Sequence, residues 1–185
     1  MIKAQVNNYV CEFSEEKLYD VTNNCEVMML WEQPIMKRCA DIVCHNRGDV
    51  LEIGFGMGIC STEIQKHSPK SHTIVENHPQ VLAELKKWAT NKNVIIIEGD
   101  WFKVKDKFTK YDGMFIDTYN DKNYLKFGDL APKLAKTGCK FTFWNDMPKR
   151  DNQFNLNAVY DKVYVTPPEN KYYNYSIYYV PTVVF

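Results

Sequence analysis

A glycine-rich turn stands where a predicted strand passes into a predicted helix, in the segment Glu52-Ile-Gly54-Phe-Gly56-Met-Gly58. Glycines at such a turn permit tight backbone conformations and let a ligand approach the main chain closely. The dinucleotide pattern G-x-G-x-x-G would place its third glycine at position 59, where this chain has Ile59. No Lys-Ser or Lys-Thr pair follows, so the turn is not the phosphate loop of an NTPase. The motif therefore favours a ligand without a diphosphate.

Two further acidic residues follow the next two predicted strands. Glu76 ends the strand 72–76, and Asp100, with Trp101 beside it, comes after the strand 93–98. A carboxylate such as Glu76 can accept both hydrogen bonds of a ribose diol. Asp100 can accept from an exocyclic amine, and the Trp101 indole can pack on a purine face. Alone, Glu76 reads as a solvated acid and Trp101 as a core residue. With the glycine turn, they predict a nucleoside pocket that suits S-adenosyl-L-methionine better than a dinucleotide.

These residues have to be positioned by the surrounding strands and helices. Short apolar runs alternate with amphipathic stretches, which is typical of a parallel α/β sheet. Ligands bind such sheets at the carboxyl ends of the strands, so the three acidic and glycine-rich sites are expected to lie together. We predict strands at 49–54, 72–76, 93–98, 112–117 and 140–144, helices at 59–67, 79–89 and 123–134, and a helix C-cap at 136–138.

The chain beyond residue 145 is tyrosine-rich and β-like. We predict a β-hairpin from the stretches 159–165 and 172–184, with a turn at 167–171. Its tyrosines could form a stacking platform for bases, but β propensity is the simpler explanation. The first 25 residues are polar and irregular, and we expect them to be a flexible segment or a lid within a single domain covering residues 1–185.

Composition narrows the class of protein. The 185 residues include 23 basic and 23 acidic side chains, which argues against binding to a nucleic-acid backbone. No apolar run approaches the length of a membrane span, and the N-terminus lacks a signal-peptide pattern. The six cysteines form no CxxC pair, so reduced thiols in a cytoplasmic protein are favoured over a disulfide or zinc framework. We therefore predict no nucleic-acid partner, no membrane partner and no metal, with a homodimer as one option for the oligomeric state.

Five segments carry a more specific signal: Val27-Met-Met-Leu-Trp-Glu-Gln-Pro-Ile-Met36, residues 50–59, Ile74-Val-Glu76, Gly99-Asp-Trp101 and Tyr111-Asp-Gly-Met-Phe-Ile-Asp-Thr-Tyr119. Together they resemble class I S-adenosylmethionine-dependent methyltransferases, and more narrowly guanidinoacetate N-methyltransferase and the arginine δ-N-methyltransferases of fungi and plants. The resemblance implies a Rossmann-like α/β fold with a seven-stranded, mostly parallel sheet and an antiparallel C-terminal hairpin. It also implies an enzyme that transfers a methyl group to the guanidino nitrogen of a small molecule.

The resemblance assigns roles to residues at the matching positions. Contacts with the cofactor S-adenosyl-L-methionine are implied for Met28, Met36, Glu52, Gly54, Phe55, Gly56, Met57, Gly58, Ile59, Cys60, Glu76, Asn77, His78, Asp100, Trp101 and Asp117. Contacts with the methyl acceptor are implied for Glu32, Asp117, Tyr119 and Asp146, with Glu32 and Asp117 as the catalytic pair. Tyr119 is expected either to orient Asp117 or to pack on the acceptor.

The chemistry of a guanidino acceptor supports this pair independently. A guanidinium is planar, stays protonated at neutral pH and presents forked N–H donors that match carboxylates. Two carboxylates can draw its positive charge away from the attacking nitrogen, and one of them can accept the departing proton. The plain alternatives are a helix-surface Glu32 and a strand-capping Asp117.

Two features depart from guanidinoacetate methyltransferases. After the strand 140–144, that family uses main-chain amides to hold the substrate carboxylate, but here Asp146 adds a negative charge and Pro148 lacks an amide donor. The region before the final hairpin is also shorter. These departures weaken the case for guanidinoacetate itself, and the candidate acceptors are free arginine, guanidinoacetate and an agmatine-like amine. The alternatives are methylation of arginine within a protein and a non-catalytic cofactor-binding protein of the same fold.

Overall fold

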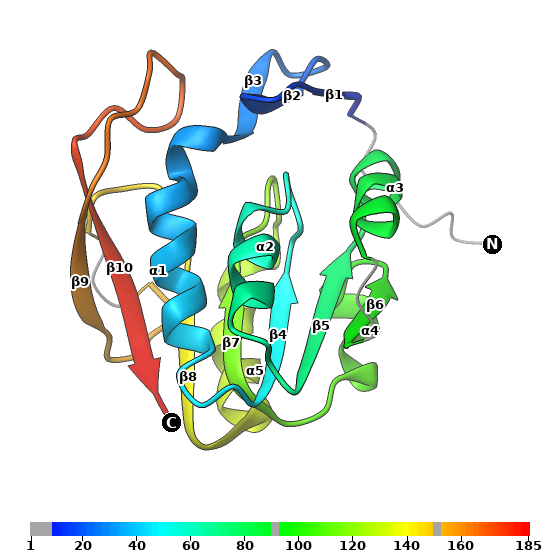
Figure 1. Cartoon of the computed structure of the whole chain (residues 1–185), viewed down its shortest axis with the longest axis vertical. Coiled ribbons are helices and arrows are strands. Elements are labelled where there is room, and N and C mark those ends of the chain that lie inside the picture. The colour runs from blue at the N-terminus through cyan, green and yellow to red at the C-terminus, as the bar shows by residue number, and fades with distance from the viewer. Residues whose placement is uncertain (1–8, 90–92, 150–152) are drawn as a thin grey trace.

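A central sheet of seven strands, in the order β6-β5-β4-β7-β8-β10-β9, organises the chain (Figure 1). The computed structural model describes residues 9–89, 93–149 and 153–185, so residues 1–8 of the predicted lid lie outside the described part. Neighbours from β6 to β8 are parallel, and β10 is antiparallel to both β8 and β9. The strands are β4 (Asp49–Ile53), β5 (Ser71–Glu76), β6 (Val94–Glu98), β7 (Tyr111–Ile116), β8 (Ala135–Phe143), β9 (Val159–Tyr164) and β10 (Ile177–Val184). The predicted mostly parallel sheet with an antiparallel C-terminal hairpin is confirmed.

Helices cover both faces of this sheet. The α-helices are α1 (Gln33–Val43), α2 (Ile59–Lys66), α3 (Pro79–Trp88), α4 (Trp101–Val104) and α5 (Phe127–Leu134), with short 3-10 turns at Leu30–Glu32, Lys105–Lys107 and Tyr124–Lys126. Proline stands in the first turn of α1 and of α3, where its missing N–H has no helical partner to lose. The longest helix, α1, packs along α2 on one face (Figure 1).

Alternation along the central strands divides the core into two layers. In β4, Val50 joins the cluster beneath α1 and α2, while Leu51 and Ile53 join the cluster beneath α4 and α5. In β7, Phe115 belongs to the first cluster and Met114 to the second. Because neighbouring strand residues point to opposite faces, a strand buried on both sides is apolar at nearly every position. The continuous apolar run 93–98 predicted a strand covered on both faces, but there the prediction is wrong: β6 is an edge strand, and Ile95 is exposed.

Within the described residues 9–29, the N-terminal segment consists mainly of short strands, whereas an irregular stretch was expected. It forms an antiparallel meander of β1 (Cys11–Phe13), β2 (Lys17–Asp20) and β3 (Cys25–Met29). The Gln80 side chain of α3 accepts from the Cys11 amide at 2.8 Å and donates to its carbonyl at 2.9 Å, as a neighbouring strand would. The meander lies above the carboxyl ends of the central strands (Figure 1), so it covers the edge where ligands bind such sheets.

Three predicted boundaries are wrong. The expected helix C-cap at 136–138 lies inside β8, because α5 ends at Leu134 and the chain turns extended at Ala135. The predicted helix 123–134 begins with a 3-10 turn and is α-helical only from Phe127. The second hairpin strand starts at Ile177 rather than at 172, so three of the tyrosines lie in the connection before it.

Candidate active site

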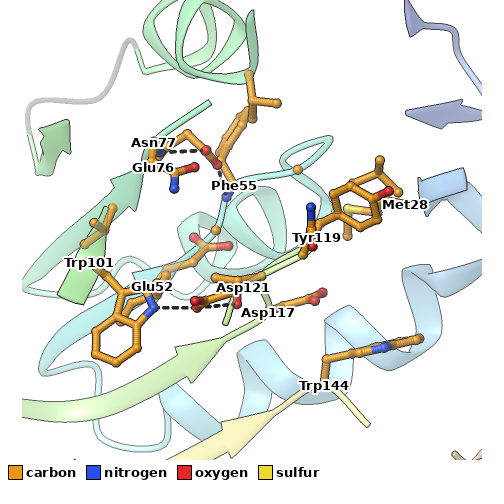
Figure 2. A pocket seen from close by; sticks show the side chains of 18 of the residues that line it. Met28, Glu52, Phe55, Glu76, Asn77, Trp101, Asp117, Tyr119, Asp121 and Trp144 are labelled. Atoms are coloured by element: carbon orange, nitrogen blue, oxygen red, sulfur yellow. Dashed lines mark hydrogen bonds between the residues drawn. The ribbon is translucent and has the colours of Figure 1, made fainter. Parts of the chain in front are cut away.

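A cavity of about 600 Å³ opens at the carboxyl ends of β4, β5, β6 and β7, under the N-terminal meander. It is lined by seven acidic residues and two lysines among the described residues: Glu26, Glu32, Glu52, Glu76, Asp100, Asp117 and Asp121 against Lys103 and Lys122. A second cavity of about 360 Å³ adjoins it and shares Asp117 and Trp144 with it. Figure 2 shows how the labelled side chains lie around this space. The surplus of carboxylates suits a cationic ligand.

The glycine turn forms the floor of the cavity. Gly54, Gly56 and Gly58 all have positive φ values, of 90°, 56° and 72°. A Cβ on Gly54 would come within 1.9 Å of the Asp117 carbonyl oxygen, and one on Gly56 within 2.6 Å of Met28 Sδ. The turn therefore needs glycine for its backbone conformation and for its close packing against β7 and β3. Met28 also accepts a hydrogen bond from the Met57 amide at 3.3 Å, which connects the meander to the turn.

Glu76 is buried at the end of β5, and its carboxylate organises the backbone around the pocket. Oε2 accepts from the Phe55 amide at 3.0 Å, and Oε1 accepts from the amides of Asn77 and His78 at 2.7 Å each (Figure 2). Burial raises the pKa of Glu76, while these amide donors oppose the rise. Oε2 therefore has one hydrogen-bond donor and Oε1 has two. The carboxylate can still accept a hydrogen bond from a hydroxyl group.

Glu52 is fully buried at the end of β4 and belongs to a polar network. Its Oε2 accepts from Ser61 Oγ at 2.5 Å and lies 2.8 Å from His72 Nε2, whose Nδ1 is 2.9 Å from Gln65 Nε2. Its other oxygen, Oε1, has no hydrogen-bond partner among the described residues, and Glu52 lines the cavity. A buried, unpartnered carboxylate oxygen is costly unless a donor arrives, so Oε1 fits the ammonium group of an amino-acid ligand.

Asp100 and Trp101 follow β6 and line the side of the cavity near Glu76. Asp100 caps α4 by accepting from the Phe102 amide at 2.9 Å. The Trp101 indole donates to Asp121 Oδ2 at 2.6 Å, and its ring packs edge-to-face on Phe127. Both residues therefore have structural partners and still contribute to the cavity wall. Asp121, which sequence reasoning missed, is the residue that orients the indole (Figure 2).

Glu32 ends the 3-10 turn before α1, where only 2% of its surface is exposed. Its Oε1 accepts from the Met29 amide at 2.7 Å and from the Tyr172 hydroxyl at 2.5 Å. Burial, and then the charge of Asp117, raises the pKa of Glu32 to about 8, although the two donors oppose the rise. Asp117 therefore lies near enough for its charge to act on Glu32.

Asp117 directly follows β7, and its main-chain amide continues the β4 pairing by donating to the Ile53 carbonyl at 3.0 Å. Its side chain lines both cavities, and within the described residues no hydrogen bond reaches its carboxylate. Burial, and then the charge of Glu52, raises the pKa of Asp117 to about 7. A carboxylate with few partners and a pKa near neutrality is suited to accept a proton.

Tyr119 lines the cavity but does not orient Asp117 through its hydroxyl. That hydroxyl donates to Asp20 Oδ2 at 3.0 Å and lies 2.9 Å from Cys25 Sγ, and the ring meets Tyr9 edge-on at 5.2 Å. These contacts join the end of β7 to the meander. Tyr119 therefore has an anchoring role in the roof of the cavity.

Asp146 lies in the wall of the second cavity, which it shares with Asp117, and not in that of the first. Two of the main-chain amides next to it are committed within the fold. Trp144 N–H donates to the Ile116 carbonyl at 3.1 Å, and Asn145 N–H donates to the Tyr178 hydroxyl at 2.6 Å. Pro148 has no amide hydrogen. These three positions therefore offer no main-chain donor to a substrate carboxylate.

The structure separates the predicted cofactor residues into two groups. Those in the cavity wall are Met28, Glu52, Gly54, Phe55, Gly56, Cys60, Glu76, Asn77, Asp100, Trp101 and Asp117. Those not in the wall are Met36, Met57, Gly58, Ile59 and His78. His78 instead stacks on Tyr9 with ring centroids 4.2 Å apart, and Met36 is part of the core.

Sequence reasoning missed Tyr172, which sits in the connection between β9 and β10 and lines the cavity. The tyrosine cluster around it was explained by β propensity. Tyr173 and Tyr178 are indeed core residues, but Tyr172 reaches Glu32 from 140 positions away in the chain. No local pattern could reveal this, because the contact depends on how the C-terminal connection returns over α1.

The fold has close relatives among solved structures. Spermidine synthase from Thermotoga maritima superposes with a TM-score of 0.68 at 14% identity, over 95% of this chain and 72% of that one. An O-methyltransferase from Bacillus cereus in complex with SAH gives a TM-score of 0.59 at 13% identity, over 85% of this chain and 82% of that one. At these identities the likeness concerns the fold, which is that of the Rossmann-like class I methyltransferases.

Sequence comparison identifies the family. The model of the guanidinoacetate N-methyltransferase family matches residues 12–163, and the chain belongs to this family. The name of this family agrees with the N-methyltransferase class predicted from the sequence.

Two curated relatives carry the name protein arginine N-methyltransferase 2. The protein from Candida glabrata is 36% identical over 153 residues, which are 76% of this chain and 37% of that protein. The Saccharomyces cerevisiae protein is 33% identical over 150 residues, which are 74% of this chain and 36% of that protein. The chain thus spans a little over a third of the length of these relatives. Among its described residues, no helix is long and apolar enough to cross a membrane.

Proposed function

We propose that this protein transfers a methyl group from S-adenosylmethionine to a guanidino nitrogen. The observation that carries the proposal is the pair of buried carboxylates, Glu32 and Asp117. Burial, and then the charge of a neighbouring carboxylate, raises both pKa values, so that a bound cation is needed to stabilise the two groups in their ionised form. A guanidinium meets this need, because it is permanently charged and its forked donors match two carboxylates. The pair lines the same cavity as the glycine turn and Glu76, the proposed cofactor residues.

Two observations support a cofactor in the first cavity: the close-packed glycine turn at positive φ, which brings main chain to the cavity wall, and the unpartnered Glu52 Oε1. Glu76 would hold the ribose hydroxyls, Glu52 the ammonium group, and Asp100 with Trp101 the adenine. When bound, S-adenosylmethionine supplies a methyl group activated by an adjacent sulfonium. Glu32 and Asp117 then have to hold the acceptor nitrogen in line with the methyl carbon and the sulfur.

The two carboxylates divide the work. Glu32, fixed by two donors on Oε1, holds the guanidinium and draws its charge toward the far nitrogens. Asp117, which no hydrogen bond constrains within the described residues, accepts the proton that the attacking nitrogen loses. The bound cofactor would supply the methyl carbon and keep the electron pair of its C–S bond, and the acceptor nitrogen would lose one proton to Asp117. A pKa of about 7 allows Asp117 to take this proton at neutral pH and to release it again.

The rest of the acceptor would occupy the second cavity, beyond Asp117. The committed amides of Trp144 and Asn145 and the absence of one at Pro148 disfavour a carboxylate placed as close to the guanidino group as in guanidinoacetate. An arginine-like or agmatine-like acceptor keeps any carboxylate farther away. Free arginine and agmatine are therefore the preferred small-molecule acceptors.

The second candidate is an arginine side chain within a protein. The names of the two yeast relatives favour it, and the second cavity continues outward from Asp117, where a longer chain would have to leave the site. The two acceptor classes share the same chemistry at Glu32 and Asp117. Competition between an arginine-containing peptide and free arginine separates them, because the preferred acceptor suppresses methylation of the other at equal concentration.

Mass spectrometry of products from a guanidine panel tests the function. The panel contains guanidinoacetate, arginine, agmatine and an arginine peptide, with lysine as the non-guanidine control. We expect a mass increase of one methyl on at least one guanidine. Asp117→Asn and Glu32→Gln should abolish the product yet leave the affinity for S-adenosylhomocysteine within about threefold of wild type. Methylation of lysine alone, or unchanged turnover in both variants, would overturn the proposal.

Three broader expectations belong to the same proposal. A single domain with the N-terminal meander as a lid is supported by Tyr9 and Met28, which line the cavity from the meander. A cytoplasmic location is supported by the six free cysteines, five of which are buried. A homodimer remains an option that gel filtration would decide.

A further inference from the structure

Tyr172 comes from the C-terminal connection, yet its hydroxyl reaches into the cavity. It donates to Glu32 Oε1 at 2.5 Å, and the same oxygen accepts from the Met29 amide at 2.7 Å. Both hydrogen bonds that Glu32 accepts within the described residues therefore end on one oxygen. Oε2 is left for a ligand in the cavity that Glu32 lines.

The surrounding structure holds Tyr172 firmly in this position. Asn170, which is buried, accepts from the amides of Tyr172 and Tyr173 at 3.0 and 2.7 Å and returns a bond to the Tyr173 carbonyl at 2.7 Å. The Tyr172 ring packs between those of Trp31 and Trp144, with centroids 6.0 and 6.3 Å away. The preceding residue, Lys171, ties the connection to the meander: its amide donates to the Glu26 carboxylate and its ammonium group to the Asn24 carbonyl. Such a preorganised donor loses little freedom when the acceptor binds.

We propose that Tyr172 is a positioning residue for methyl transfer: it holds Glu32 by Oε1 so that Oε2 faces the guanidino group of the acceptor. This inference rests on the proposed function and extends it to the C-terminal connection. Tyr172 is not a base, because burial and the charge of Glu32 raise its pKa and keep the phenol protonated. It acts only as a donor, which favours the ionised form of Glu32.

Removing the Tyr172 hydroxyl changes no other titratable group near Glu32. The cavity wall that holds Glu32 also contains Glu26 of β3, Glu52 of β4, Cys60 of α2, and Asp117, Tyr119 and Lys122 after β7. Of these, Asp117 acts on Glu32 through its charge and raises the pKa. Without the Tyr172 hydroxyl, only the Met29 amide would still oppose the rise of the Glu32 pKa. Glu32 is therefore expected to keep its proton to a higher pH.

The test is Tyr172→Phe, which keeps the ring and removes only the hydroxyl, with Tyr175→Phe as the matched control. Tyr175 lies in the same connection, is 51% exposed and contacts the ring of Tyr173. Carbon-13 labelling of glutamate lets NMR follow the titration of Glu32, assigned with Glu32→Gln. We expect the Glu32 pKa to rise by about one unit or more in Tyr172→Phe and to stay unchanged in Tyr175→Phe, since a hydrogen bond to a charged group is lost.

Kinetics with the best guanidine provide the second readout. The KM of Tyr172→Phe for the acceptor should exceed that of wild type about tenfold at pH 7 and converge with it above pH 9.5, because Glu32 is then ionised in both enzymes. Affinity for S-adenosylhomocysteine should not change.

An unchanged Glu32 pKa, or a KM ratio that stays constant across this pH range, would overturn the positioning role. A shifted pKa in an enzyme that binds and methylates no guanidine would confirm the Tyr172–Glu32 coupling and reject the proposed function instead.

Discussion

Binding of a guanidinium to the empty site should release protons, and the number follows from the structure. With pKa values of about 8 and about 7, Glu32 and Asp117 are both partly protonated at neutral pH. At pH 7, Glu32 is about one-tenth ionised and Asp117 about half ionised. A guanidinium cation bound between them favours the charged form of both. If both become fully ionised, about one to one and a half protons leave per acceptor bound.

Isothermal titration calorimetry measures this number directly. The acceptor is titrated into the complex with S-adenosylhomocysteine, which prevents turnover, in buffers that differ in their enthalpy of ionisation. The dependence of the observed heat on the buffer enthalpy gives the protons released. At pH 9.5 both carboxylates are ionised before binding, so the release should fall to nearly zero.

Substitution of one carboxylate separates the two contributions. In Asp117→Asn, the Asp117 share disappears and the Glu32 pKa falls because a neighbouring negative charge is lost, so fewer than about one proton should leave at pH 7. Glu98→Gln is the control, since Glu98 lies at the end of β6, is paired with Lys86 and does not line the cavity. Binding at pH 7 with no buffer dependence would refute the reasoning, because it would mean that the acceptor binds without charging the pair.

Three other outcomes test the site. Glu76→Gln should weaken S-adenosylhomocysteine binding about tenfold to a hundredfold in calorimetry, since the new amide cannot accept from all three backbone donors. Glu98→Gln, at the position on β6 that pairs with Glu76 of β5, should leave this binding unchanged. Gly56→Ala should lower cofactor affinity, while Gly138→Ala, also at positive φ but with open space around it, should cost only about 1 kcal/mol of stability in urea unfolding. Glu32→Gln should raise the unfolding free energy of the unliganded protein by up to about 4–5 kcal/mol at pH 8.5 and leave it unchanged near pH 4, as thermal melts would show.

The sign of this last effect follows from proton linkage. The pKa of Glu32 is higher in the folded protein, about 8, than its ordinary value of 4.5, so the folded state binds more protons between these values. Its unfolding free energy therefore decreases as the pH rises through this window. A glutamine carries no charge to bury, so the variant escapes this loss. A lower melting temperature for Glu32→Gln at pH 8.5 would contradict the assigned burial cost.

Much of the fold could be predicted because it rests on local signals. The apolar runs of β4 to β7 and the glycine turn define the parallel half of the sheet, and Glu76 and Asp117 could be located because they end those strands. The N-terminal meander could not, since its strands are short and polar. Its stability comes from contacts such as Gln80 with Cys11 and Tyr119 with Asp20, which join positions 69 and 99 residues apart.

Only part of the candidate site could be predicted from the sequence, because several of its contacts join residues that are distant in the chain. Glu32 and Asp117 could be named from specific segments, but three side-chain interactions in the site could not. Glu52 affects Asp117 across two neighbouring strands, Tyr172 reaches Glu32 from the far end of the chain, and Asp121 orients Trp101 from a loop. Each of these contacts is set by the tertiary fold, and the spacing of residue types along the chain contains no record of it.

The placement of Glu32 and Asp117 has a consequence for selectivity. Burying two interacting carboxylates costs the unliganded protein stability, as their raised pKa values indicate. A cation offsets that cost on binding, whereas a neutral acceptor of the same shape would leave both groups protonated and gain only packing. An alkylammonium has the charge but concentrates it at one point, so it cannot satisfy both carboxylates with a planar fork. The negative charge of Glu32 and Asp117, which destabilises the protein without a ligand, therefore selects a guanidinium. By its hydrogen bond to Glu32, Tyr172 sets how far Glu32 is ionised at neutral pH.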